Sequence, residues 1–341
     1  MYAPAGPPFE RARRHPRLCA ALGHRPSRPA RPAVTLPVRQ IALTGATGFV
    51  GQAVLDVAAR EGISVRALTR RPQPARRGVE WVPGDLADGA ALARLMDGAE
   101  AVVHVAGVVN TPDPAVFEAG NVAGTLAVIE AVRAAGVARL VHVSSLSARE
   151  PELSQYGASK ARGERLVLAS GLDWTIVRPP AVYGPRDADM LDLFRSAARW
   201  GVVPVPAQGR TSMIHAEDLA RLLLALLPAS EAVSFRTFEP DDGKPYAWSH
   251  VDMARAIGAA VGRRVRIVRL AARWMQLAAK ADMWARKGKA RLTLDRVGYM
   301  LHPDWSVSRE GRVPPEVWEP RISTRAGLKA TADWYRAQGW L

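Results

Sequence analysis

The stretch LTGATGFVGQAV, residues 43–54, places three glycines, Gly45, Gly48 and Gly51, between an apolar run and a segment whose apolar residues have helical spacing. The run before it, 38–43, is short and has four apolar residues out of six, which is typical of a β-strand. A strand, a tight turn and a helix in this order direct free backbone N–H groups at one place, and glycines let a pyrophosphate approach them. The stretch therefore predicts a dinucleotide site, although a G-x-x-G-x-x-G spacing is also consistent with an ordinary turn.

Short apolar runs alternate with helical stretches from residue 38 onward, which is typical of a parallel sheet with crossover helices. We expect an α/β fold: a doubly wound Rossmann sheet followed by a smaller, mostly helical C-terminal substrate domain. The sheet domain is expected to span 40–240, with 179–213 contributing to the substrate site, and the substrate domain 241–341. The expected strands are 41–43, 65–68, 101–105, 140–143 and 174–177.

Two segments carry nearly all of the formal net charge of +15 on this 341-residue chain. Residues 1–39 hold eight Arg against one Glu, and residues 263–296 hold eleven Lys or Arg against two Asp. The first segment also has eight prolines and no sustained periodicity, which predicts a disordered basic arm. Its composition resembles a transit peptide, and an extension from a misplaced start fits equally well, so we assign it no function.

Composition excludes several classes of protein. The single cysteine, Cys19, excludes an internal disulfide framework and a cysteine-rich metal site, and we expect no metal. The longest strongly apolar stretch, 222–227, is far shorter than the roughly 20 residues that cross a bilayer, so no transmembrane helix is expected. The basic segments lack an aromatic-interleaved binding module, so we expect no nucleic-acid partner. The oligomeric state, monomer or homodimer, is left open.

The end of the second expected strand bears on the choice of nucleotide. NAD sites of this kind usually place an Asp or Glu there to hold the ribose 2′-hydroxyl. In VRALTRRP, residues 65–72, that place is taken by Thr69, Arg70 and Arg71. Guanidinium groups suit a 2′-phosphate, so we expect NADPH rather than NADH, although arginines that are merely solvated fit the same sequence.

Catalytic residues are predicted in HVSSLSAREPELSQYGASKARGE, residues 142–164. Tyr156 and Lys160 are four apart, so on a helix they lie on one face, one turn from each other. We expect the ammonium group to lower the pKa of the phenol from about 10, which makes it a usable general acid or base. Ser145, at the end of the preceding strand, is placed to hold the substrate oxygen. A surface pair of Tyr and Lys is the alternative, but the preceding Ser-Ser and the glycine turn argue against coincidence.

In combination these motifs resemble the extended branch of the short-chain dehydrogenase/reductase family, also called NAD-dependent epimerase/dehydratase-like proteins. The resemblance covers residues 40 to about 341. The remaining motifs that carry it are GDL (84–86), HVAG (104–107), NVAGT (121–125), VSS (143–145), VRPPAVYGP (177–185) and MIHAEDLA (213–220).

The family resemblance implies a role for each site residue. It makes Ser145, Tyr156 and Lys160 the catalytic residues, supports them with Asn121, and lets Lys160 also hold the nicotinamide ribose. The missing acid after the second strand departs from the NAD-using pattern. The expected cofactor-binding residues are Gly45, Thr47, Gly48, Phe49, Val50, Gly51, Arg70, Arg71, Asp85, Leu86, Val105, Ala106, Gly107, Tyr156, Lys160 and Pro179.

Family membership does not name the substrate, because related sites serve epimerases, dehydratases and ketone reductases. Dehydratases in this family tend to place an acidic pair after the strand-end serine, where this chain has Leu-Ser-Ala at 146–148. Arg186, Arg210 and Arg309 form no pattern typical of a nucleotide-diphosphate site. We therefore expect an oxidoreductase. A nucleotide-sugar epimerase and a non-catalytic assembly subunit, of the kind found in respiratory complex I, are the alternatives.

A basic segment in the C-terminal third bears on the kind of substrate. Apolar residues from 266 to 285 recur with helical spacing, and four cations follow at intervals of seven. Such a helix, with tryptophan at its edge, is typical of a segment that lies on an anionic membrane, and a cap helix with a solvated face fits equally. The cations are Arg266, Arg273, Lys280 and Lys287, and the tryptophans are Trp274 and Trp284.

A membrane-facing cap over a reductase site favours a lipid or other hydrophobic substrate. Within the family, LVHVSSLSAREPELSQYGASKARGE (140–164) and WYRAQGWL (334–341) are similar to bacterial reductases of the sphingolipid pathway. That resemblance implies reduction of the 3-oxo group of an oxidised ceramide, with NADPH as hydride donor. Arginine outnumbers lysine 41 to 6, which indicates a GC-rich bacterial source. We expect a cytoplasmic protein, peripheral on the cytoplasmic face of the membrane.

Overall fold

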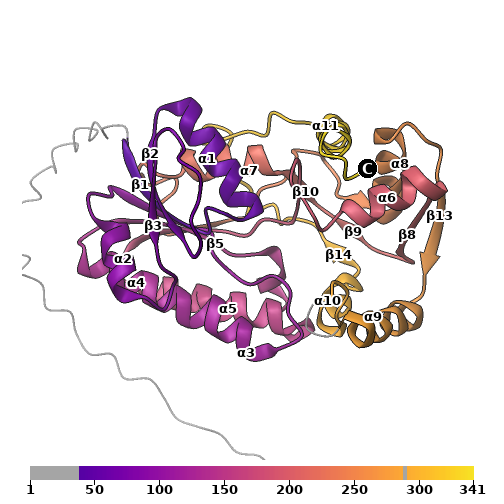
Figure 1. The fold of residues 1–341 in the computed structure, drawn as a ribbon, viewed down its shortest axis with the longest axis horizontal. Helices are drawn as coiled ribbons and strands as arrows, with labels where there is room; N and C mark the ends of the chain where they lie inside the picture. Colours follow the sequence, from indigo (N-terminus) through magenta and orange to yellow (C-terminus); the bar gives the residue numbers. More distant parts are fainter. Residues whose placement is uncertain (1–37, 287–289) are drawn as a thin grey trace, which may run out of the picture. The chain divides into compact units, whose positions relative to one another are not determined.

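A seven-stranded parallel sheet organises the computed structural model, which describes residues 38–286 and 290–341 (Figure 1). The strand order is β11-β6-β5-β4-β1-β2-β3, with the reversal between β1 and β4 at which a doubly wound sheet binds a dinucleotide. The expected arm, apart from 38–39, and Lys287 lie outside the described residues. The strands are β1 (Gln40–Thr44), β2 (Ser64–Thr69), β3 (Val79–Pro83), β4 (Ala101–His104), β5 (Arg139–Val143), β6 (Asp173–Val177) and β11 (Arg236–Phe238).

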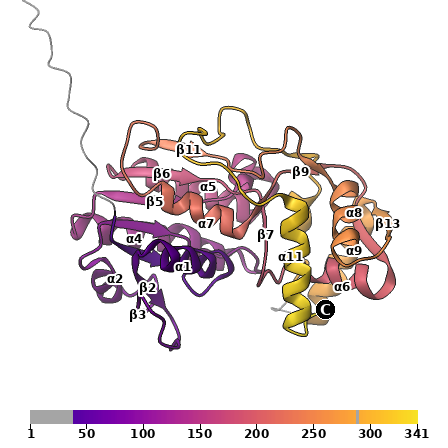
Figure 2. The ribbon, with the colours of Figure 1, turned by 90° about the horizontal axis from the view of Figure 1, so that it is seen from above.

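Helices cover both faces of this sheet, and each layer has its own apolar core (Figures 1 and 2). One layer contains α1 and α7, which pack on each other as well as on the sheet. The other contains α2, α4 and α5. The helices are α1 (Phe49–Glu61), α2 (Gly89–Met96), α4 (Gly124–Ala134), α5 (Gln155–Leu168) and α7 (Ala216–Ala225).

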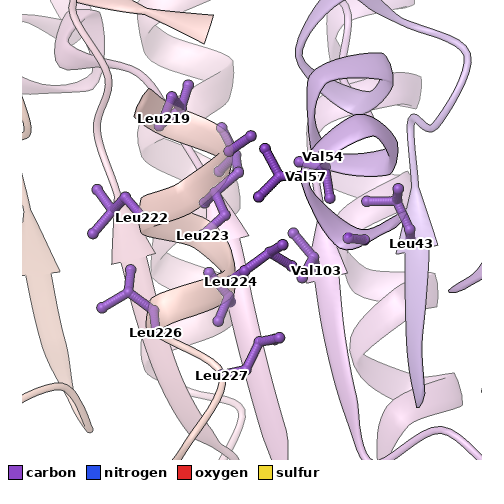
Figure 3. Packing of buried hydrophobic residues seen from close by; sticks show 14 of the residues in the cluster. Leu43, Val54, Val57, Val103, Leu219, Leu222, Leu223, Leu224, Leu226 and Leu227 are labelled. Carbon is purple, nitrogen blue, oxygen red and sulfur yellow. The ribbon is translucent and has the colours of Figure 1, made fainter. Parts of the chain in front are cut away.

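The α1/α7 layer is held together by branched aliphatic side chains (Figure 3). Val54 and Val57 of α1 meet Leu219 and Leu223 of α7, and all four are at most 1% exposed. Complete burial of one such side chain stabilises the fold by about 1.5–3 kcal/mol. The apolar run at 222–227 thus belongs to the core of the protein.

One helical stretch, Pro114–Ala134, is long and apolar enough to span a membrane by length and composition. It consists of α3 (Pro114–Phe117), the π-helical turn η1 (Glu118–Ala123) and α4. Val128, Ile129 and Val132 of α4 are buried in the core shared with α2 and the sheet. Because its apolar side already packs against protein, we interpret the stretch as a core helix.

The C-terminal part combines segments that precede and follow β11. A third core unites Phe194 of α6 with Ile257 of α8 and Leu328 of α11. Three small sheets pair β7 with β10, β8 with β13, and β9 with both β12 and β14. The elements are β7 (Ala181–Tyr183), α6 (Leu191–Trp200), β8 (Val202–Pro206), β9 (Arg210–Thr211), β10 (Met213–His215), β12 (Trp248–Ser249), α8 (His250–Ala260), β13 (Arg266–Leu270), α9 (Ala272–Arg286), α10 (Leu294–Met300), β14 (Asp304–Trp305) and α11 (Thr324–Ala337).

The five expected strands of the large sheet are confirmed, whereas β3 and β11 were not expected. Strand β11 has only three residues, and β3 lies at the sheet edge with little apolar periodicity. The expected helix from 266 to 285 is wrong at its start, because 266–270 form β13 and the helix begins at Ala272. The β-branched pair Ile267 and Val268 favours a strand, and β8 provides the edge on which it pairs. Domain boundaries at 240 remain a prediction.

Replacing Leu223 by Ala should lower the free energy of unfolding by about 2–5 kcal/mol, because the cavity between α1 and α7 cannot fully close. Leu223 is 0% exposed, whereas Leu277 of α9 is 56% exposed and provides a matched control. Leu277→Ala should change stability by less than about 0.5 kcal/mol. Urea unfolding followed by circular dichroism measures both, and equal losses would contradict the packing described.

Candidate active site

The glycine turn brings the backbone of α1 into direct contact with the end of β1. Gly45 has a φ of +73°, and a Cβ atom there would lie 2.6 Å from the backbone nitrogen of Ala106. A Cβ atom on Gly51 would lie 2.1 Å from the carbonyl oxygen of Gly45. Gly48 caps α1 without a side-chain hydrogen bond, and the first turn has no acidic residue. The first N–H groups of α1 are therefore available to a pyrophosphate.

The other expected cofactor-binding residues follow the carboxyl ends of neighbouring parallel strands. Because the sheet is parallel, these ends share one edge, at the point where a doubly wound sheet binds its ligand. The structure therefore gathers residues that are far apart in sequence along one line. Thr47, Phe49 and Val50 lie after β1, Arg70 and Arg71 after β2, Asp85 and Leu86 after β3, Val105, Ala106 and Gly107 after β4, and Pro179 after β6.

A cleft of about 450 Å³ lies at the ends of β2 and β3 and contains the predicted nucleotide-selecting residues. Arg70, Arg71 and Asp85 line it together with Thr69 and Trp81. The Thr69 hydroxyl donates to the carbonyl oxygen of Arg71 at 2.6 Å and accepts from its backbone nitrogen at 3.3 Å. This local turn holds both arginines at the cleft, where their side chains are exposed.

Tyr156, Ser145 and Lys160 converge at the same edge. Tyr156 lies in the first turn of α5, which Ser154 caps, and its hydroxyl lies near Ser145. The Ser145 hydroxyl also accepts from the hydroxyl of Ser147 at 2.9 Å. The buried Lys160 ammonium donates to the carbonyl oxygen of Val143, the last residue of β5, at 2.9 Å. The predicted triad is therefore brought together by β5 and α5.

Burial is the largest cause of the pKa shifts of both Tyr156 and Lys160. Tyr156 lies between the rings of Phe117 and Tyr299, with both ring centroids 6.0 Å from its own. Burial raises the pKa of Tyr156 to about 12, against the lowering effect of the nearby Ser145 hydroxyl. Burial lowers the pKa of Lys160 to about 8. The expected lowering of the tyrosine pKa by Lys160 is wrong, because desolvation outweighs it and the ammonium is directed at Val143.

Asn121 lies in η1 and is 1% exposed. Its side-chain oxygen accepts from the backbone nitrogen of Val108 at 2.7 Å, and its amide nitrogen donates to the carbonyl oxygen of Val108 at 2.9 Å. The same nitrogen donates to the hydroxyl of Ser159 at 2.8 Å. Asn121 thus ties the loop after β4 to α5 beside Lys160, and π-helical turns are frequent at functional sites.

Helix α10 lies beside α5 (Figure 1). It contributes three side chains around Tyr156 that the sequence did not predict. The Asp295 carboxylate accepts from the backbone nitrogens of Gln155 at 2.6 Å and Tyr156 at 3.4 Å, so it caps α5. Tyr299 faces the Tyr156 ring, and Arg296, paired with Asp189 at 3.1 Å, tends to lower the tyrosine pKa. No motif or spacing links positions about 140 residues apart, so only the fold could find these contacts.

Comparison with known proteins agrees with this geometry. Residues 41–239 match the model of the NAD dependent epimerase/dehydratase family. The chain belongs to this family. It is 40% identical over 311 residues to a ceramide reductase of Caulobacter vibrioides, covering 88% of this chain and 96% of that protein. It is 31% identical over 238 residues to a 2-alkyl-3-oxoalkanoate reductase of Stenotrophomonas maltophilia, covering 60% and 71% respectively.

Solved structures share the fold across nearly the whole chain. The UDP-glucose 4-epimerase of Thermus thermophilus, in complex with NAD, has a TM-score of 0.65 and 21% identity, covering 87% of this chain and 99% of that one. At this identity the likeness concerns the fold alone. Membership of the extended short-chain dehydrogenase/reductase family, predicted from the motifs, is confirmed, and the protein is an NAD(P)-dependent oxidoreductase of that family.

Replacing Gly51 by Ala should weaken binding of the nicotinamide dinucleotide at least about tenfold, a loss of about 1.4 kcal/mol. The added methyl group would meet the Gly45 carbonyl oxygen, which is backbone and cannot move without displacing the turn. Gly89→Ala is the matched control, because nothing lies within 4 Å of a Cβ atom at the start of α2. Fluorescence titration with NADPH measures both affinities; an unaffected Gly51→Ala protein would contradict the proposed approach of the cofactor.

Proposed function

We propose that the protein is an NADPH-dependent reductase that acts on the ketone of a hydrophobic, lipid-like substrate of the 3-oxo-ceramide type. The observation that carries this proposal is the convergence, at one edge of the sheet, of Ser145 and Lys160 with a half-buried Tyr156 phenol whose pKa is raised to about 12. Such a phenol is protonated at neutral pH, as a proton donor to a ketone must be. Similarity to a ceramide reductase and a 3-oxoalkanoate reductase supports the same reaction and the lipid class.

The chain's own residues divide the reaction between them. A bound nicotinamide dinucleotide supplies the hydride that reduces the carbonyl carbon. Ser145 donates a hydrogen bond to the carbonyl oxygen, and Tyr156 donates its proton to that oxygen, which completes the alcohol. Lys160, charged below a pKa of about 8, is placed one turn from Tyr156 to hold the nicotinamide ribose, and solvent returns the proton to the phenolate. The pyrophosphate would be held by the turn that begins at Gly45 and by the first N–H groups of α1.

The surroundings of Tyr156 fit a hydrophobic ketone. Phe117 and Tyr299 flank its ring, and α10 places Arg296 on the same side as a polar contact for groups next to the ketone. A long-chain substrate of this kind resides in a membrane rather than in water. The proposal therefore includes a peripheral location on the cytoplasmic face of the membrane.

The alternatives fit the site less well. An epimerase must hold a nucleotide diphosphate, but Arg186 is paired with Asp56 at 2.7 Å and Arg210 lies 4.0 Å from Asp304. The epimerases among the solved structures are too distant in sequence to assign a substrate. A non-catalytic assembly subunit would not need Tyr156, Ser145 and Lys160 to lie together at the edge of the sheet.

We expect the protein to bind NADPH more tightly than NADH, because Arg70 and Arg71 line the cleft at the end of β2. The variant Arg70→Ala/Arg71→Ala should bind NADPH about tenfold or more weakly, since charge-assisted hydrogen bonds to the 2′-phosphate are lost, and NADH with little change. Arg77→Ala, an exposed arginine between β2 and β3, is the control. Equal affinity of the wild type for the two nucleotides would refute the NADPH assignment.

The function itself is tested by supplying purified protein with NADPH and 3-oxo-ceramide in detergent micelles. We expect oxidation of NADPH and a ceramide product identified by mass spectrometry. Tyr156→Phe should lower kcat by about 100-fold or more while binding NADPH almost normally, because only the proton donor is removed.

Tyr246→Phe, at a tyrosine that is 78% exposed, controls for loss of a phenol elsewhere. Interconversion of UDP-glucose and UDP-galactose, without reduction of any keto lipid, would replace the proposal with the epimerase. Full activity of Tyr156→Phe would remove Tyr156 from the mechanism.

A further inference from the structure

Helix α9 leaves an apolar stripe uncovered. It buries Met275 and Ala279 against α10, while Trp274, Leu277 and Trp284 on its other side are 54%, 56% and 85% exposed. Spacings of three and seven residues place these three side chains on one face of the helix. Single exposed apolar residues are ordinary, but an aligned set with two tryptophans indicates an interaction surface.

Cations border this stripe. Arg273 and Lys280 lie along one edge of it and are exposed, and in the described part of the chain neither forms a salt bridge. Arg266 and Arg269 of β13, the strand that leads into α9, are exposed as well. The structure thus corrects the predicted row of cations: Arg266 belongs to a strand, and the two helical cations flank tryptophan and leucine.

We propose that this face of α9, defined by Trp274, Leu277, Trp284, Arg273 and Lys280, docks on an anionic lipid surface. The helix would lie in the plane of the headgroups, with its apolar stripe inserted and its cations at the phosphates. Tryptophan suits this depth because one edge of its ring is apolar and the other carries an N–H group. This inference rests on the proposed function in one respect: a substrate that resides in the membrane explains why docking would be useful.

Charge argues for lipid over the other possible occupants. The segment 263–296 holds eleven Lys or Arg and two Asp, a net charge of +9 by sequence. A second copy would bring the same positive face against it, and residues 1–39, with eight Arg and one Glu, also carry +7. The positive charge of the segment repels a second copy and residues 1–39 alike. An acidic membrane instead attracts each cation near its surface by about 1 kcal/mol.

Helix α10 lies between the docking face of α9 and Tyr156. Met275 and Ala279 of α9 pack on Val297 of α10, and Tyr299 of α10 faces Tyr156. Helices α9 and α10 lie side by side (Figure 1). A protein docked through α9 therefore holds its substrate side close to the lipid. This continuity connects the surface to the site without requiring any change of conformation.

The test is sedimentation of the full-length protein with vesicles of phosphatidylcholine, with or without phosphatidylglycerol. We expect binding that requires phosphatidylglycerol and weakens with added salt. Arg273→Gln/Lys280→Gln should weaken it roughly 30-fold, the equivalent of two cations at about 1 kcal/mol each. Trp274→Ala/Leu277→Ala/Trp284→Ala should abolish it, and Tyr246→Ala, at an equally exposed aromatic residue, should not.

Each alternative has its own signature. No binding to anionic vesicles, or binding unchanged by the triple variant, overturns the proposal. A dimer in solution that the triple variant dissociates overturns it in favour of a second copy. Turnover of a water-soluble short-chain ketone should be the same in the wild type and the triple variant. Vesicle binding by a protein that reduces no ketone would refute the proposed function and leave this surface standing.

Discussion

The contact between the backbones of Gly45 and Gly51 constrains the rest of the structure. With no side chain at either position, α1 starts directly at the end of β1, and its first N–H groups face the carboxyl edge of the sheet. The same placement sets α1 against α7, and their valines and leucines form the core on that face (Figure 3). One close approach of main chain therefore determines both a nucleotide-binding turn and a packed layer.

Desolvation governs the electrostatics of the site. A neighbouring ammonium is expected to favour a phenolate, yet here Lys160 is directed at Val143 and burial keeps the proton on Tyr156. The result suits donation of a proton to a ketone, whereas abstraction of a proton from an alcohol requires the phenolate. Burial thus keeps Tyr156 in the protonated form that the proposed reduction requires.

The C-terminal part of the chain completes the site from a distance. Asp295 caps the helix that carries Tyr156, and Tyr299 closes the side of its ring. Gly298 permits this close packing, because a Cβ atom there would lie 2.5 Å from the carbonyl oxygen of Leu153. The sheet supplies the edge at which Tyr156 lies, and α10 supplies part of the surroundings of its ring.

The sequence alone determined the features that depend on neighbours along the chain. Gly45, Gly48 and Gly51 predicted the turn, the spacing of Tyr156 and Lys160 predicted their common helix face, and alternating apolar runs predicted five strands of the parallel sheet. These signals are local, because turn geometry and helical periodicity extend over a few residues.

The tertiary structure alone decided what depends on contacts between distant segments. Residues 266–270 form strand β13 because β8 provides an edge with which they pair. The helical periodicity of the sequence therefore predicted the wrong structure for these residues. Asp295 contacts α5 only because the fold brings α10 beside it, and the pKa of Tyr156 rises because separate elements partly bury it. The free energies of burial and of strand pairing are set by partners that no stretch of the sequence contains.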